Sequence, residues 1–193
     1  QIEMRKSFCS LISFLLFSLL ACGAASAHWY VAPTGNDANN GSKRKPLKTI
    51  AAALQRVNPG DTVFLREGSY REFVVPTRSG KPGKMITLKS YPGETAKIDG
   101  SDLYIKGWGN ALVQVNNIDY MQFENLHICH AHDSENNTDP EGVYITGTSG
   151  NITFRGCKVY DIKNDCPLVD AKGDWRSAHA ILVLSLIHIS EPT

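Results

Sequence analysis

The feature of this 193-residue sequence that most constrains its fold is a repeat of short apolar strands in its second half. Segment 120–128 aligns with segment 151–159 at an offset of 31 residues, which places Phe123 on Phe154. Repeats of about 20 to 50 residues are typical of solenoids, in which neighbouring units stack to bury a shared core. The repeat therefore predicts a stack of coils.

The composition of one repeat predicts which solenoid forms. Each repeat holds short strands and no helical stretch, which excludes leucine-rich and helical repeats. Asn125 and Gly156 fall at equivalent bends between two strands, and both residue types tolerate a left-handed backbone. Segment 143–145 recurs as 181–183 across a longer loop, so the two belong to one sheet. We therefore predict an all-β parallel β-helix with three sheets.

One amphipathic helix is predicted over residues 49–57. Ile50, Leu54 and Val57 lie at positions i, i+4 and i+7, and the Pro59-Gly60 pair ends the pattern. A β-helix exposes strand edges and core at its open end. We therefore predict that this helix caps the solenoid with its three apolar side chains buried.

Residues 1–27 predict export. The basic Met4-Arg5-Lys6, the apolar run 11–20 and the small residues Ala25-Ser26-Ala27 are typical of a secretory signal peptide. The apolar run is too short for a transmembrane anchor. Leu19-Leu20-Ala21-Cys22 also resembles a bacterial lipobox, so a lipid anchor at Cys22 is an alternative to cleavage. Either route predicts a secreted, periplasmic or outer-surface protein.

Both ends of the sequence hold segments that we exclude from the fold prediction. Residues 1–3 precede the predicted initiator Met4 and resemble upstream read-through. Residues 184–193 match the translation of a common transposase sequencing adapter, so we interpret them as foreign. We expect the β-helix domain to span 28–183 and the natural protein to continue beyond Val183. The chain is then expected to hold only part of an active site.

Composition narrows the function classes. The net charge of +1 gives no sign of a nucleic-acid partner. Cys129, Cys157 and Cys166 follow the predicted signal, and they are an odd number without metal-ligand spacing. We expect buried thiols rather than a disulfide framework.

The opening of the predicted mature chain resembles a known family. The matching residues are Tyr30-Val31-Ala32-Pro33, Gly35-Asn36-Asp37, Gly41-Ser42, Pro46, Thr49-Ile50, Pro59-Gly60-Asp61-Thr62-Val63, Gly68-Ser69-Tyr70, Glu72, Pro82-Gly83, Ile86-Thr87, Tyr91-Pro92-Gly93 and Ile98-Asp99-Gly100. They resemble the pectate-lyase-like right-handed β-helix superfamily, closest to family nine polysaccharide lyases and next to family six alginate and chondroitin lyases. The resemblance covers the natural mature chain and implies a right-handed coil. Its members include lyases, glycoside hydrolases and proteins of no known activity.

The resemblance implies a chemistry. Lyases of this fold cleave uronic-acid polymers by β-elimination, which needs a base and a neutralised carboxylate, often through Ca²⁺. The substrate lies along the sheet that here contains 143–145 and 181–183. We therefore predict a secreted, monomeric, Ca²⁺-dependent lyase acting on an anionic polysaccharide such as pectate. A glycoside hydrolase with two carboxylates and a non-catalytic carbohydrate-binding protein are the alternatives.

Two polar loops lead into that sheet. The first holds His130, His132, Asp133, Glu135, Asp139 and Glu141, and the second holds Asp161, Asp165, Asp170, Asp174, Arg176 and His179. Crowded carboxylates suit Ca²⁺, whose predicted ligands are Asp161, Asp165, Asp170 and Asp174. The predicted substrate groove comprises His130, His132, Tyr144, Arg176 and His179. For any single acid the alternative is a solvated turn former, and the two histidines lack an evident third ligand. No catalytic residue is assigned, and Lys158 and Lys163 are candidate bases by type alone.

Overall fold

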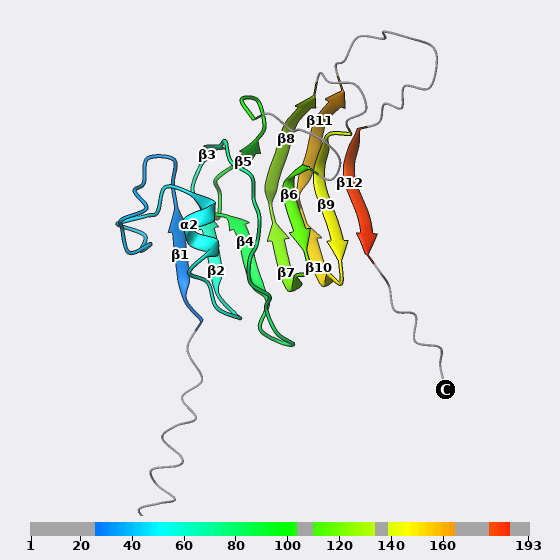
Figure 1. Ribbon diagram of the computed structural model, residues 1–193. Coiled ribbons are helices and arrows are strands. Elements are labelled where there is room, and N and C mark those ends of the chain that lie inside the picture. The colour runs from blue at the N-terminus through cyan, green and yellow to red at the C-terminus, as the bar shows by residue number, and fades with distance from the viewer. Residues whose placement is uncertain (1–25, 104–109, 134–138, 165–177, 186–193) are drawn as a thin grey trace, which may run out of the picture.

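The chain winds into stacked coils of short parallel strands (Figure 1). This computed structural model describes residues 26–103, 110–133, 139–164 and 178–185. Its strands are β1 (His28–Val31), β2 (Thr62–Leu65), β3 (Gly68–Tyr70), β4 (Ile86–Ser90), β5 (Ala96–Asp99), β6 (Ala111–Asn116), β7 (Asp119–Glu124), β8 (Leu126–Asp133), β9 (Glu141–Gly147), β10 (Gly150–Arg155), β11 (Lys158–Asn164) and β12 (His179–Ser185). Sheet A has the order β1-β2-β4-β7-β10, sheet B β11-β8-β5-β3 and sheet C β12-β9-β6. The predicted three-sheet parallel β-helix is confirmed.

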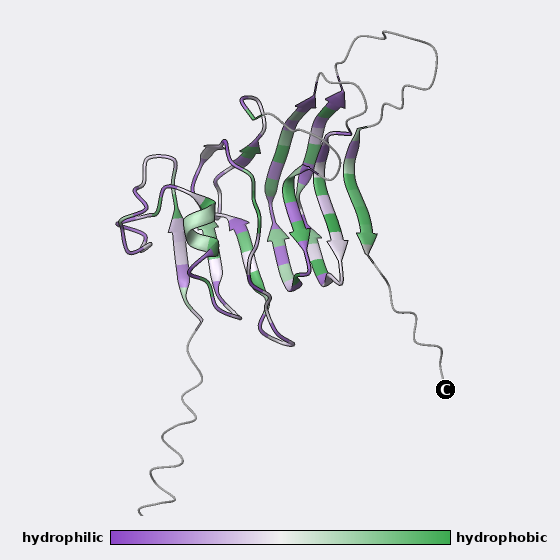
Figure 2. Cartoon of the chain, in the orientation of Figure 1, coloured by the Kyte–Doolittle hydropathy of each residue, from purple (hydrophilic) through white to green (hydrophobic). Residues whose placement is uncertain are grey.

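The interior is a set of apolar ladders, one side chain per coil. Hydrophobic and hydrophilic residues alternate along the strands (Figure 2), as a sheet with one buried face requires. Phe154 pairs with Phe123, and their rings stack with centroids 4.6 Å apart at an interplanar angle of 6°. In sheet C, Val143 pairs with Ile181. Both predicted offsets are therefore confirmed.

The bend between sheets A and B needs a left-handed residue in each coil. Asn125 has φ 54° and Gly156 has φ 62°. A Cβ atom on Gly156 would lie 2.4 Å from Asn125 Oδ1, so the stacked amide leaves room only for glycine in the next coil. The predicted equivalence of the two bends is confirmed.

Helix α2 (Ile50–Leu54) closes the N-terminal end of the coils (Figure 1). Its first turn is satisfied by side chains, because Thr49 Oγ1 accepts from Ala52 N and the Glu72 carboxylate accepts from the amides of Ile50 and Ala51. Ile50, Leu54 and Val57 are at most 2% exposed, as predicted. The helix is shorter than the predicted 49–57, and a turn in which Val57 N donates to Ala53 O continues it.

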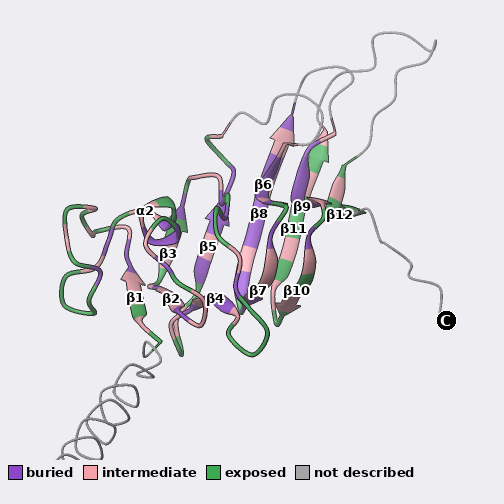
Figure 3. Ribbon diagram, turned by 60° about the horizontal axis from the view of Figure 1, so that its bottom comes forward, coloured by how far each residue is buried: buried purple, intermediate pink, exposed green. Residues whose placement is uncertain are grey.

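Two strands were not predicted. β3 has three residues and begins with Gly68, while β5 carries Lys97 between Ala96 and Ile98, so neither shows a long apolar pattern. β12 extends through Leu184 and Ser185, which lie in the segment predicted to be foreign. Burial is densest in the earlier coils and lower in β10, β11 and β12 (Figure 3).

Candidate functional site

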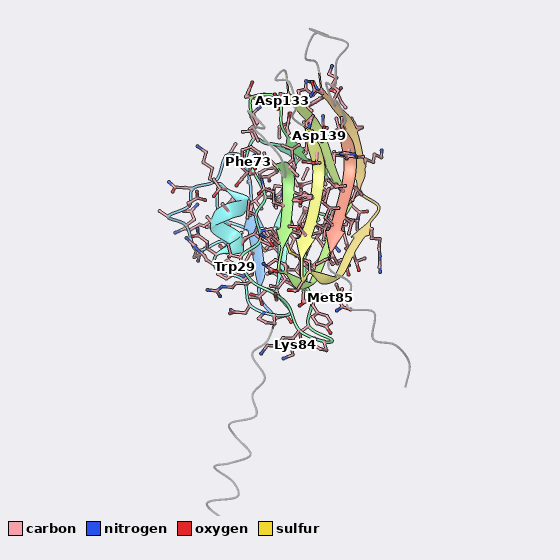
Figure 4. The ribbon with its side chains drawn as sticks, turned by 45° about the vertical axis from the view of Figure 1, so that its right-hand side comes forward. Trp29, Phe73, Lys84, Met85, Asp133 and Asp139 are labelled. Atoms are coloured by element: carbon pink, nitrogen blue, oxygen red, sulfur yellow. The ribbon has the colours of Figure 1, made fainter. Side chains whose placement is uncertain are left out.

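The corner where sheet B passes into sheet C gathers acidic residues. β8 ends at Asp133 and β9 begins at Glu141, with Asp139 just before it. Asp133 and Asp139 lie at the same edge of the sheets, at the top of Figure 4. We call Asp133, Asp139 and Glu141 the carboxylate corner. Strand alternation directs Glu141 inward, on the same side as Val143 and Ile145.

Glu141 is the most unusual acid of this corner. It is 2% exposed, and its Oε2 atom has no hydrogen-bond partner among the described residues. Burial, and then the charge of Asp139, raise the pKa of Glu141 to about 7. Its in-register neighbour on β12 is His179, whose Nδ1 atom is likewise buried with no hydrogen-bond partner in the described part of the chain.

Acidic residues flank the turn into sheet C: Asp133 ends β8, and Asp139 lies close enough to Glu141 for its charge to act on that carboxyl group. Carboxylate oxygens are the ligands that a hard divalent cation such as Ca²⁺ prefers. A buried carboxylate oxygen without a donor is costly unless something positive compensates it. The orphaned Oε2 of Glu141 and the like charge of Asp139 are therefore consistent with a bound cation.

The outer face of sheet C carries a short row of side chains beside the corner. Gln114, Tyr144 and Leu182 are in register on β6, β9 and β12. They point away from the interior row of Val113, Val143 and Ile181 because successive residues alternate. Tyr144, half-buried, offers an aromatic surface with a polar tip to whatever lies along this sheet.

A second polar cluster lies on the outer face of sheet B. His130 Nδ1 is 2.9 Å from Asp99 Oδ1. Asp161 Oδ2 lies 3.5 Å from His130 Nε2 and 3.2 Å from His132 Nε2. His130 and Asp161 have left-handed φ values of 59° and 55°, which is uncommon for residues other than glycine and occurs often at functional sites.

The structure thus separates the residues that we predicted as one site. His130, His132 and Asp161 lie together on sheet B, Tyr144 lies on sheet C, and His179 opens β12 beside Glu141. Lys163 Nζ is 3.8 Å from Asp161 Oδ1. The predicted Ca²⁺ ligands Asp165, Asp170 and Asp174 and the predicted groove residue Arg176 lie outside the described residues.

Sequence reasoning missed two partners of these histidines. The third group beside His130 and His132 is Asp161, which follows His130 by the same 31 residues that relate Phe123 to Phe154. Applying the repeat to polar residues would have found it. Asp99 lies one coil earlier, in the strand that the sequence did not predict.

Comparison with known proteins decides the family. Residues 29–184 match the family model described as the Pel9A-like, right-handed β-helix region. The chain belongs to this family. The family resemblance predicted from the sequence is confirmed, and with it the right-handed coil.

Two relatives illustrate the range of the family. The uncharacterized protein YwoF of Bacillus subtilis (strain 168) is 31% identical over 144 residues, which are 75% of this chain and 31% of YwoF. Pectate lyase PEL9 of Emericella nidulans is 27% identical over 150 residues, 72% of this chain and 35% of that protein. The chain therefore spans about a third of the length of these relatives.

A solved structure supports the fold alone. The GH136 lacto-N-biosidase from Eubacterium ramulus is 18% identical with a TM-score of 0.58, over 82% of this chain and 30% of that one. Among the described residues, no helix is long and apolar enough to cross a membrane.

Proposed function

We propose that this chain is part of an extracytoplasmic polysaccharide lyase that cleaves uronic-acid polymers by β-elimination with the help of Ca²⁺. The observation that carries the proposal is its membership in the Pel9A-like β-helix family over residues 29–184. A relative named as a pectate lyase aligns with 72% of the chain, which favours a pectate-like substrate.

The carboxylate corner supports the Ca²⁺ part of the proposal. Asp133, Asp139 and Glu141 would hold the ion, and the predicted ligands Asp161, Asp165, Asp170 and Asp174 stay candidates for the following coil. Bound there, Ca²⁺ would neutralise a uronate carboxylate and so acidify the neighbouring carbon-bound proton. The cation would also offset the charge that burial disfavours on Glu141.

The outer face of sheet C supports the substrate part. Tyr144 would stack on a sugar ring, and Gln114 and Leu182 flank it along the coil axis at one-strand spacing, about 4.8 Å. His179 stays a proposed groove residue at the start of β12. His130, His132 and Arg176 remain proposed groove residues. The base that removes the proton is not assigned among the described residues.

Export is the remaining part of the proposal. Residues 1–27 would direct the protein out of the cytoplasm and be removed before His28, unless Cys22 is lipidated. Mass spectrometry of the mature N-terminus from fractionated cells tests this. A cytoplasmic product that retains Met4 would contradict it.

Calorimetric titration with trigalacturonate tests the site on this chain. We expect binding that requires Ca²⁺, no binding of neutral maltotriose, and loss of binding in Glu141→Gln. The matched control is Glu67→Gln, an exposed glutamate elsewhere in the solenoid that should bind normally. Binding that is independent of Ca²⁺, or equal for both sugars, would contradict the proposal.

The reaction itself is assayed on the full product of the gene, since the aligned residues cover only 31% and 35% of the two relatives. Release of unsaturated, ultraviolet-absorbing products from polygalacturonate supports the lyase. Reducing ends without that absorbance would show a glycoside hydrolase instead. If neither product forms, the non-catalytic carbohydrate-binding protein is the alternative that remains.

A further inference from the structure

The cluster on the outer face of sheet B contains a second set of metal-ligating atoms, different in kind from the carboxylate corner. Asp99, Cys129 and His130 each offer one ligand atom, and these three atoms lie within 4.8 Å of one another. We propose that Asp99, Cys129 and His130 form a site for a transition-metal ion of the Zn²⁺ class.

The sheet register builds this cluster. Asp99 of β5 pairs with Cys129 of β8, so their side chains lie on the same outer face, one strand apart. The left-handed backbone of His130 interrupts the alternation of β8 and brings its ring against Asp99, with Nδ1 2.9 Å from Oδ1. Two consecutive residues of one strand can therefore serve a single site. Without that conformation they would point to opposite faces.

The donor set selects the metal. A thiol sulfur, an imidazole nitrogen and a carboxylate oxygen are ligands that Zn²⁺ accepts, whereas Ca²⁺ and Mg²⁺ prefer oxygen alone. Ligand atoms around Zn²⁺ lie roughly 3 to 4 Å apart. The Asp99 and His130 atoms are already near that spacing at 2.9 Å, and the pairs with the Cys129 sulfur, within 4.8 Å, need to close by at most about 1 Å. A metal would take the place of the hydrogen bond between Asp99 Oδ1 and His130 Nδ1.

The surroundings hold the ligands in place. Cys129 is fully buried and Asp99 is 6% exposed, while the side chain of His130 is 35% exposed and leaves one side accessible. The backbone N–H and the hydroxyl of Ser101 both donate to Asp99 Oδ1, at 3.1 and 2.6 Å, and these hydrogen bonds hold the carboxylate beside His130.

Asp161 supplies the supporting contact typical of a metal-bound histidine. Metal-ligating histidines usually donate their second ring N–H to a carboxylate, which fixes the tautomer. Here the Asp161 carboxylate faces Nε2 of His130 at 3.5 Å, which leaves Nδ1 for the metal. Tyr160 of β11 is in register with Cys129 and lies beside it on the same face of sheet B.

Cobalt substitution tests the site directly. Titrating the purified chain with Co²⁺ should give a near-ultraviolet thiolate-to-cobalt absorption band that Zn²⁺ abolishes and excess Ca²⁺ does not. Cys129→Ser should lose the band. Cys157→Ser is the matched control, because Cys157 is the other free thiol among the described residues and lies at the bend between sheets A and B. That variant should keep the band.

Two further variants keep the test decisive if Cys129→Ser does not fold. His130→Gln should abolish tight Co²⁺ binding, and Asp161→Asn should weaken it by roughly 10- to 100-fold. Circular dichroism of each variant checks the fold. A wild-type chain without the band, or a band that survives in folded Cys129→Ser or His130→Gln, would overturn the proposal.

Discussion

Two acids at the N-terminal end of the solenoid, the buried Asp61 and the half-buried Glu72, differ from the buried Glu141 at the sheet C corner. Asp61 accepts from Ala27 N, Asn58 N and Trp29 Nε1, at 2.7, 2.9 and 3.1 Å. Glu72 accepts from two amides of α2. Glu141 is as buried as Asp61, yet one of its oxygens has no hydrogen-bond partner among the described residues.

The difference separates structural acids from a candidate ligand. Asp61 and Glu72 compensate their burial by satisfying backbone donors that would otherwise be orphaned. Burial raises the pKa of Glu72 as it does that of Glu141, so the pKa alone does not distinguish them. The partners do. An acid whose burial is not compensated by the protein is a candidate for binding something else.

The largest expected effect is on a structural acid. Asp61→Ala leaves three donors without their acceptor and should lower the free energy of unfolding by about 3 kcal/mol, measured by urea denaturation. The control is Asp102→Ala, whose side chain is 63% exposed and pairs with Arg71. That change should cost less than about 0.5 kcal/mol. Similar costs for both variants would remove the distinction drawn for Asp61.

Glycine bends give a second comparison between earlier and later coils. Gly156→Ala adds a left-handed penalty and a Cβ contact of 2.4 Å with Asn125 Oδ1. Gly93→Ala adds only the cost of a left-handed backbone, since no atom lies within 4 Å of its Cβ position. We expect losses of about 2 and about 1 kcal/mol in urea denaturation. Equal losses of stability in the two variants would show that the Asn125 side chain moves away from the added Cβ atom without cost.

Glu141→Gln should have the opposite sign. The pKa of Glu141 is raised from 4.5 to about 7, so the folded state binds the proton more tightly than the unfolded state. Stability without Ca²⁺ should therefore fall as pH rises from about 4.5 to about 7, and stay lower above that. Gln removes this loss, so the variant should melt a few degrees higher at pH 8 but not at pH 4. A variant less stable than wild type at pH 8 would contradict this.

The sequence predicts the stacked apolar side chains of the interior better than the clusters of polar side chains. Phe123 and Phe154 were placed correctly because inward apolar side chains repeat with the coil. Asn125 and Gly156 were placed because only a left-handed bend needs those residues. β5 was missed because Lys97 faces outward in a strand too short for periodicity to show, and Asp99 was missed with it.

The polar groups depend on features that no local pattern reports. His130 and Cys129 share a face only because His130 is left-handed, a conformation for which histidine gives a weak signal. The inward direction of Glu141 depends on where β9 begins, and a shift of one residue would reverse it. Strand boundaries are the least predictable feature of a sequence, so the buried acid had to come from the structure.

Thermal unfolding with and without Ca²⁺ tests the central claim, that the carboxylate corner around Glu141 binds a divalent cation. A ligand at a hundredfold excess over its Kd stabilises the folded state by about 2.7 kcal/mol, or roughly 5 to 10 °C in Tm. We expect a shift of this size at pH 8 for the wild-type chain and for Glu67→Gln, and almost none for Glu141→Gln. An equal shift in Glu141→Gln, or no shift in the wild-type chain, would contradict the account.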